Sequence, residues 1–175
     1  MLENFLLDYF VKFTERIYPD SLNANFVTIM GQVPQLITTL IFLIHFGFDP
    51  MVDQPVENHK YFIWSGLALM WFNHHDLMDG MRARRQKLGS PFGRLLDEAS
   101  DMIQMACYTA VFCHAIRIDN NLLNLVYLAL NIICFTMEMK YLLCNELILN
   151  LGDVGSVEIE NLFAIFFILA GLYGP

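Results

Sequence analysis

Apolar stretches without charge follow one another along most of the chain, separated by short polar breaks. Residues 26–48 form the longest stretch, with 23 residues that include no Asp, Glu, Lys or Arg. About 20 such residues are enough for a helix to cross a bilayer. Residues 120–137 give 18 residues, and 61–75, 102–116 and 161–175 give 15 each. Fifteen residues also fit a buried helix of a soluble bundle, so that architecture stays open for the shorter stretches.

Turn-forming residues stand between the stretches. Asp49-Pro50 and Gly89-Ser90-Pro91 are combinations that favour a reversal of the chain. The pattern therefore predicts an all-α membrane protein with about five transmembrane helices. These helices are expected at residues 26–48, 61–88, 91–117, 120–143 and 157–173.

The first 22 residues have a different pattern. Their apolar residues recur at helical spacing, as Leu2, Phe5, Leu6, Tyr9, Phe10 and Phe13. This spacing predicts an amphipathic helix that lies on the membrane surface over residues 1–22, ahead of a transmembrane domain at 23–175. Glu3 and Asp8, without a basic region before them, argue against a secretory signal.

Composition narrows the class of protein. Hydrophobic residues make up 56% of the chain and charged residues only 16%, whereas soluble domains carry about 25% charged residues. The formal net charge is −8, which repels phosphate backbones at long range. A disordered chain and a nucleic-acid partner are therefore excluded.

The basic residues predict an orientation in the membrane. With the expected helices, one side would carry Lys12, Arg16, Arg82, Arg84, Arg85, Lys87, Arg94 and Lys140. The other side would carry only Lys60 and Arg117. This imbalance places the N-terminus in the cytoplasm or its equivalent.

The four cysteines suggest packing rather than chemistry. They are Cys107, Cys113, Cys134 and Cys144, all in or beside apolar stretches, and none forms a C-x-x-C pair. We interpret them as small apolar residues, in preference to a disulfide or metal role.

Four acidic residues lie within the helices that we expect to cross the membrane, where a charged side chain is energetically costly. Asp76 and Asp79 are three residues apart and Asp97 and Asp101 are four apart, so each pair shares one face of a helix. Asp79 and Asp101 lie 11 residues on either side of Ser90, which places both about 16 Å from the turn if both arms are helical. Like charges so close together cannot all stay ionised without cations. The spacing predicts a site for hard divalent ions, with two Mg²⁺ ions acting on a phosphate substrate.

Simpler explanations exist for each part of this stretch. A pair of carboxylates could form a proton relay, or an ion pair with Arg82 or Arg94. Small residues at 80, 83 and 93 could serve helix packing alone. The basic residues at 82–87 could serve only as a cytoplasmic loop.

The complete spacing is more specific. Asp76, Asp79, Gly80, Ala83 and Arg84 are followed, after eight residues, by Gly93, Asp97 and Asp101. This D-x-x-D-G-x-x-A-R and G-x-x-x-D-x-x-x-D pattern resembles that of the CDP-alcohol phosphotransferases. The segment DGMRARRQKLGSPFGRLLD is most similar to the choline/ethanolamine phosphotransferases. The resemblance extends over roughly residues 18–175.

The resemblance implies a helical membrane enzyme. Such an enzyme would transfer a phospho-alcohol from a CDP-alcohol to diacylglycerol and release CMP. By analogy, two Mg²⁺ or Mn²⁺ ions would be held by Asp76, Asp79, Asp97 and Asp101, with Asp101 as the general base. The CDP pocket would be shaped by Gly80, Ala83, Arg84 and Gly93.

The chain departs from the subgroup at several points. The subgroup usually has His after the third acid, where this chain has Glu98, which could be a substitute in base catalysis. Met81 and Arg82 replace a Lys-Gln pair. The five expected helices compare with six in the family's catalytic core. His75, four residues before Asp79, could hold that carboxylate in place, or could simply bond a neighbouring helix.

Two functions therefore remain open. One is a phosphotransferase, complete as a homodimer or with another membrane chain, in the endoplasmic reticulum or Golgi. The other is a divergent, inactive member that acts as a structural or lipid-binding subunit of a larger complex, for which the mitochondrial inner membrane is also possible. The sequence does not indicate which CDP-alcohol is used.

Overall fold

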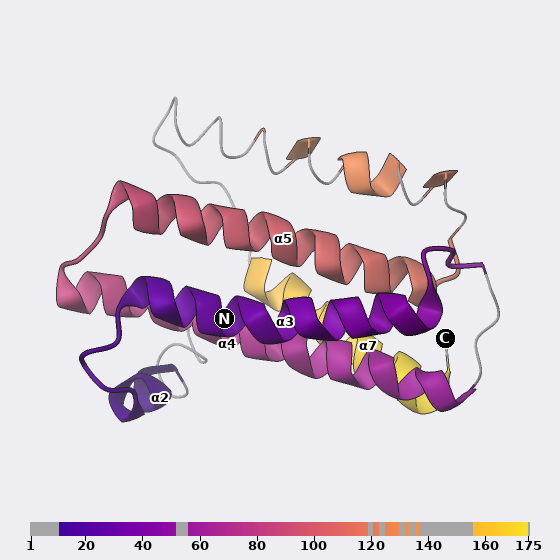
Figure 1. Ribbon diagram of the computed structural model, residues 1–175, viewed down its shortest axis with the longest axis horizontal. Helices are drawn as coiled ribbons and strands as arrows, with labels where there is room; N and C mark the ends of the chain where they lie inside the picture. The colour runs from indigo at the N-terminus through magenta and orange to yellow at the C-terminus, as the bar shows by residue number, and fades with distance from the viewer. Residues whose placement is uncertain are drawn as a thin grey trace.

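The computed structural model describes residues 11–51, 56–118, 121–122, 125–129, 132–133, 136 and 156–174. Every regular element within these residues is helical. The elements are α2 (Lys12–Ile17), α3 (Ala24–Phe46), the 3-10 helix η2 (Val56–His59), α4 (Lys60–Gln86), α5 (Pro91–Ala115) and α7 (Ser156–Tyr173). Four long helices lie roughly along one axis, and α2 lies beside the end at which α4 turns into α5 (Figure 1). The prediction of an all-α chain is confirmed for the described residues.

Local sequence explains where the helices begin and end. Asn23 caps α3 by accepting a hydrogen bond from the Asn25 N–H at 3.1 Å. Ser90 caps α5 by accepting one from the Gly93 N–H at 3.0 Å, and Pro91 occupies the first turn, where a missing N–H costs nothing. Lys87 ends α4 with a left-handed φ of 55°. The turn expected at residues 89–91 is therefore present.

Small residues bring the helices close together. At Gly31 of α3, an added Cβ would lie 2.7 Å from the His75 Cβ of α4. At Gly66 of α4, it would lie 2.6 Å from the Ala164 carbonyl oxygen of α7. Any residue with a Cβ at these two positions would push the helices apart. Close approach of helix backbones at glycine is typical of helix packing in membranes.

The main apolar core lies away from the α4–α5 turn. Its buried members are Phe42, Phe46, Phe62, Leu69, Val111, Ala115, Ala164, Phe167 and Ala170. Helices α3, α4, α5 and α7 all contribute, so this cluster joins the four helices. The acidic residues lie at the other end of the bundle, beside a smaller buried cluster of Val11, Val27 and Met78.

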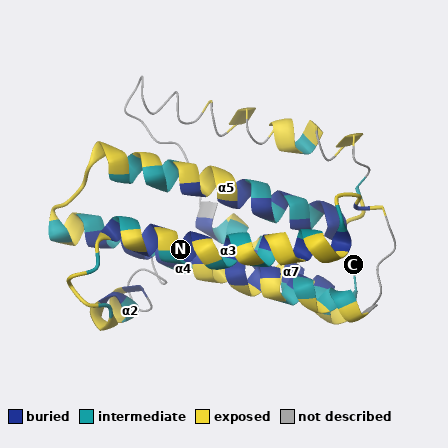
Figure 2. Ribbon diagram, in the orientation of Figure 1, coloured by how far each residue is buried: buried dark blue, intermediate teal, exposed yellow. Residues whose placement is uncertain are grey.

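The outer surface of the bundle is also apolar. Figure 2 shows exposed positions along the outer sides of the helices and buried positions between them. On α3 the exposed side chains include Ile29, Val33, Ile37, Leu40 and Ile44. An apolar exterior of this extent is typical of a helix that faces lipid.

The number of membrane crossings is not confirmed. Within the described ranges, only α3 is both long and apolar enough to pass as a span. Helices α4 and α5 carry the charged residues of the acidic stretch, which lowers their mean hydropathy. The expected helix at 120–143 lies largely outside the described residues, as do residues 1–10 of the expected surface helix.

Helices α3, α4, α5 and α7 begin and end within two residues of the positions expected from the sequence. Cys107 and Cys113 are buried and free, which agrees with a packing role, whereas Cys134 and Cys144 lie outside the described residues.

Candidate metal and nucleotide site

Three of the four predicted carboxylates meet between α4 and α5. Asp76, Asp79 and Asp97 each offer an oxygen, and these oxygens lie within 4.8 Å of one another. Asp79 is buried, and Asp76 and Asp97 are half-buried. The Oδ1 of Asp97 is buried without a hydrogen-bond partner among the described residues. A cluster of oxygen donors with an unused buried oxygen has the chemistry of a site for a hard divalent cation.

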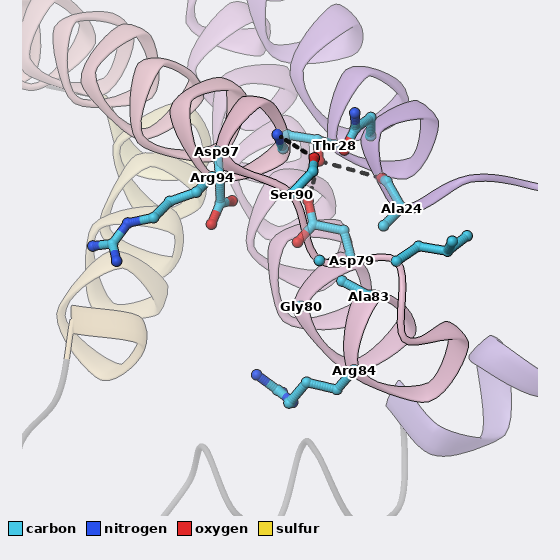
Figure 3. A pocket seen from close by; sticks show the side chains of 13 residues that line it. Ala24, Thr28, Asp79, Gly80, Ala83, Arg84, Ser90, Arg94 and Asp97 are labelled. Atoms are coloured by element: carbon cyan, nitrogen blue, oxygen red, sulfur yellow. Dashed lines mark hydrogen bonds between the residues drawn. The ribbon is translucent and has the colours of Figure 1, made fainter.

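Thr28 holds one of these carboxylates in place. Its hydroxyl donates to Asp79 Oδ2 and also to the Ala24 carbonyl oxygen, at 3.3 Å for the latter (Figure 3). The bond ties the first turns of α3 to α4 at the cluster. Thr28 was not predicted from the sequence, because nothing near it in the chain indicates a metal site.

Asp101 lies on the same face of α5 but outside this group of three. It is exposed, and it interacts electrostatically with Asp97 and with Glu160 of α7. Three of the four aspartates thus meet within 4.8 Å, and Asp101 lies outside that group while it interacts electrostatically with Asp76 as well. Its assignment as a ligand or general base stays a prediction.

Glu160 is an acidic residue that the sequence pattern did not indicate. With its amide nitrogen turned toward α7, Asn73 donates to Glu160 Oε2 at 2.8 Å and to the Leu69 carbonyl oxygen at 3.2 Å. Asn73 stands one helical turn before Asp76, and Glu160 interacts electrostatically with Asp76. Because Glu160 follows Asp101 by 59 residues, only the packing of α7 against α4 could reveal it.

A pocket of about 230 Å³ adjoins the carboxylates. It is bounded by the ends of α3, α4 and α5, and Figure 3 shows Asp79 on α4 and Asp97 on α5 at its edge. The lining residues are Ala24, Asn25, Thr28, Asp79, Gly80, Ala83, Arg84, Leu88, Gly89, Ser90, Gly93, Arg94 and Asp97. All four residues that the resemblance assigned to the CDP pocket are therefore in this lining.

Close packing keeps part of this pocket free of side chains. At Gly93 an added Cβ would lie 2.9 Å from the Asn25 Oδ1 and 3.2 Å from the Ser90 Oγ. At Gly80 it would meet only the far end of Arg84, at 3.6 Å. A side chain at Gly93 would thus displace the polar groups of Asn25 and Ser90, whereas Gly80 leaves room for a ligand.

His75 does not hold Asp79, contrary to one expectation. Its Nδ1 bonds the Trp71 carbonyl oxygen at 2.9 Å and its Nε2 bonds the Tyr18 hydroxyl at 3.1 Å. Both ring nitrogens are therefore used on the side of α4 that faces the N-terminal segment. The alternative, a simple bond to a neighbouring segment, is the one observed.

Glu98 is held by a neighbour on its own helix. Arg94 Nη2 lies 3.5 Å from Glu98 Oε1, one turn away on α5. Both side chains are partly exposed, so this ion pair is worth little in energy. It nevertheless gives Glu98 a partner other than a substrate, and its catalytic role stays a prediction.

Comparison with known proteins agrees with this site. The family model "CDP-alcohol phosphatidyltransferase" matches residues 22–172. Choline/ethanolaminephosphotransferase 2 of Arabidopsis thaliana is 30% identical over 111 residues, which are 63% of this chain and 28% of that protein. Cholinephosphotransferase 1 of Saccharomyces cerevisiae is 27% identical over 178 residues, 99% of this chain and 43% of that protein.

A further relative is cholinephosphotransferase 1 of Gallus gallus, 30% identical over 121 residues, 69% of this chain and 35% of that protein. The chain thus spans less than half the length of these relatives. The family match nevertheless includes both acidic pairs and the pocket residues between them. We conclude that the chain belongs to the CDP-alcohol phosphatidyltransferase family, a membrane-integral family of transferases.

Proposed function

We propose that the protein is a phosphotransferase that moves phosphocholine or phosphoethanolamine from a CDP-alcohol to diacylglycerol, with release of CMP. The observation that carries the proposal is the meeting of Asp76, Asp79 and Asp97 within 4.8 Å beside a pocket. Two helices supply these residues, and the same two helices supply the small residues that leave the pocket open. The names of the relatives support this choice of substrates.

The donor set fits magnesium or manganese. Carboxylate oxygens are the ligands that such hard ions prefer, and Asp97 has a buried oxygen still unused. We propose that Asp76, Asp79 and Asp97 hold one ion and that Asp101 helps to hold a second. Bound there, the ions would neutralise the diphosphate of the donor and the charge of the leaving CMP.

The protein groups have separate tasks in this reaction. Gly80 and Ala83 leave space for the nucleotide, and Arg84 offers a guanidinium to its phosphates. The acceptor hydroxyl oxygen forms a bond to the phosphorus that carries the alcohol. The bond from that phosphorus to the bridging oxygen breaks, and CMP leaves with the electron pair. Asp101, which is exposed and lies outside the group of three, takes the hydroxyl proton.

A second candidate has one observation in its favour. Glu98 stands where the resemblance implies a histidine, and it is paired with Arg94. If that histidine takes part in base catalysis in the subgroup, a chain without it could serve as a structural or lipid-binding subunit of a larger membrane complex. It could still bind the metal and the nucleotide.

An activity assay separates the two functions. The purified protein in lipid nanodiscs receives Mg²⁺, diacylglycerol and either CDP-choline or CDP-ethanolamine, and released CMP is measured. We expect release that falls at least a hundredfold in Asp101→Asn, while Glu57→Gln, an exposed acid of η2 distant from the site, matches the wild type. Absence of CMP release from the wild type, with Mg²⁺ bound, would support the subunit instead.

A further inference from the structure

The segment before α3 lies against the last turns of α4, on the side of α4 away from the pocket. Thr14 Oγ1 lies 2.9 Å from His74 Nε2, and Gln86 Nε2 donates to the Asp20 and Leu22 carbonyl oxygens at 2.9 and 3.1 Å. This segment includes α2, which Figure 1 places beside the end of α4. Polar contacts thus join this segment to α4.

Arg82 is the central contact. Its side chain is fully buried, and Nη2 donates to the Tyr18 carbonyl oxygen at 3.2 Å and to the Pro19 carbonyl oxygen at 2.8 Å. Its Nε lies 3.6 Å from Oε1 of the buried Glu15. A buried guanidinium is costly without partners, so these contacts fix both the arginine and the segment that accepts from it. Lysine, with a single ammonium, could not reach all three groups in this geometry.

A continuous path of contacts and chain segments connects Arg82 to Asp79. Arg82 follows Asp79 by three residues on α4. The segment that it binds continues through the Asn23 cap into α3, where Thr28 donates to Asp79. Helix α3 is therefore fixed to α4 at Asp79 through Thr28, and the segment just before α3 is fixed to α4 at Arg82. The pocket wall formed by Ala24 and Thr28 lies between these points.

We propose that Arg82 is a positioning residue for the metal and nucleotide site. It sets the separation between α3 and α4 at Asp79, without touching metal or substrate. The inference rests on the proposed function, because it requires that the site bind a divalent ion. The inference explains why this chain has an arginine at position 82, where the subgroup usually has another residue, and why Glu15 is buried beside it.

Apolar packing is the simpler explanation that a test must separate. Val11, Val27 and Met78 form a small buried cluster with Tyr18 packed against it. This cluster could hold the segment without help from Arg82. The arginine would then contribute to stability alone, and an apolar replacement of the ion pair would leave the metal site unaffected.

The experiment compares Mn²⁺ affinity, from electron paramagnetic resonance of free Mn²⁺, with folding stability in the same nanodiscs. The double variant Glu15→Met/Arg82→Met removes both buried charges together. Arg85, which also pairs with Glu15 at 2.7 Å, is exposed and keeps its second partner Asp20 at 2.6 Å, so no buried charge is left unpaired. Such replacements are often neutral for stability. We expect it to unfold near the wild type and to bind Mn²⁺ about five- to tenfold more weakly. Arg82→Lys should weaken binding by about threefold.

Arg16→Gln is the matched control, because Arg16 is an exposed cation of the same segment. It should bind Mn²⁺ as the wild type does. Wild-type affinity in a stably folded double variant would overturn the inference and leave the proposed function intact. Failure of the wild type itself to bind Mn²⁺ would overturn the proposed function, and the inference with it.

Discussion

The hydroxyl group of Thr28 holds one carboxylate of the cluster in place. Thr28 donates to Asp79, which is buried beside two other acids. Hydrogen bonds to charged groups contribute about 1.5–3 kcal/mol, and a buried partner left alone costs a similar amount. We expect Thr28→Val to lower the free energy of unfolding by about 2 kcal/mol in the presence of EDTA, measured by SDS titration in mixed micelles.

Thr28→Ser tests the reason for this loss, because it keeps the donor and removes only a methyl group. It should cost less than about 1 kcal/mol, in the range for loss of a small apolar group. Equal losses in the two variants would mean that packing, not the bond to Asp79, decides the effect.

At the scale of residues, the sequence indicates contacts within the acidic stretch and misses those from distant segments. Asp76, Asp79 and Asp97 are joined by one helix–turn–helix, so their spacing alone predicts that they meet. Thr28 and Glu160 reach the site from α3 and α7. Their contribution depends on how the helices pack. Threonine and glutamate are common in helices, so their presence in the sequence does not by itself indicate a role at the site.

At the scale of elements, the cap of α5 connects local sequence to the site. Ser90 accepts from the Gly93 N–H, and Asp97 follows on the same helix. Loss of such a cap costs about 1 kcal/mol. Ser90→Ala should lower the free energy of unfolding by about that amount, while Ser90→Asp, which keeps an acceptor, should stay within a few tenths. An unchanged stability in Ser90→Ala would show that Pro91 alone suffices to start the helix.

The contact between α4 and α7 is a second prediction at this scale. A Cβ on Gly66 would meet the Ala164 backbone oxygen at 2.6 Å, whereas at Gly89 nothing lies within 4 Å. Overpacking of this kind costs about 1–3 kcal/mol. Gly66→Ala should therefore destabilise the protein by that amount in SDS titration, and Gly89→Ala should be neutral or slightly stabilising. A neutral Gly66→Ala would mean that α7 can move away from α4 at little cost.

The helices themselves were predictable from apolar runs and turn residues, because both act locally. Ser90-Pro91 favours a helix start, and a run of 23 uncharged residues at 26–48 is long enough for a membrane-spanning helix. The N-terminal segment was less predictable. In α2 the buried side chain is the acidic Glu15, and the exposed side chains include Phe13 and Ile17, which reverses the usual pattern. Glu15 is tolerated there because Arg85 and Arg82 of α4 pair with it, at 2.7 and 3.6 Å.

At the scale of the whole molecule, the acidic end and the aromatic end should respond differently to metal. Phe42, Phe62 and Phe167 form an apolar core that needs no ion. The carboxylates at the other end repel one another without one. Binding to the folded state alone stabilises it by RT ln(1 + [L]/Kd), about 2.7 kcal/mol at a hundredfold excess over Kd. Saturating Mg²⁺ should therefore raise the free energy of unfolding by about 2–3 kcal/mol over that in EDTA.

Asp97→Asn tests whether Mg²⁺ binds at the aspartates, because it should affect the free energy of unfolding differently in EDTA and in Mg²⁺. Without metal, it removes one of the mutually repelling charges within 4.8 Å, so the variant should be more stable than the wild type in EDTA. With Mg²⁺, it lacks a ligand, so the added stability should largely disappear. Glu57→Gln, whose side chain is exposed on η2, should keep the full response to Mg²⁺. If Mg²⁺ stabilised Asp97→Asn as much as the wild type, the ion would bind elsewhere, and the three aspartates would form an acidic cluster without a metal.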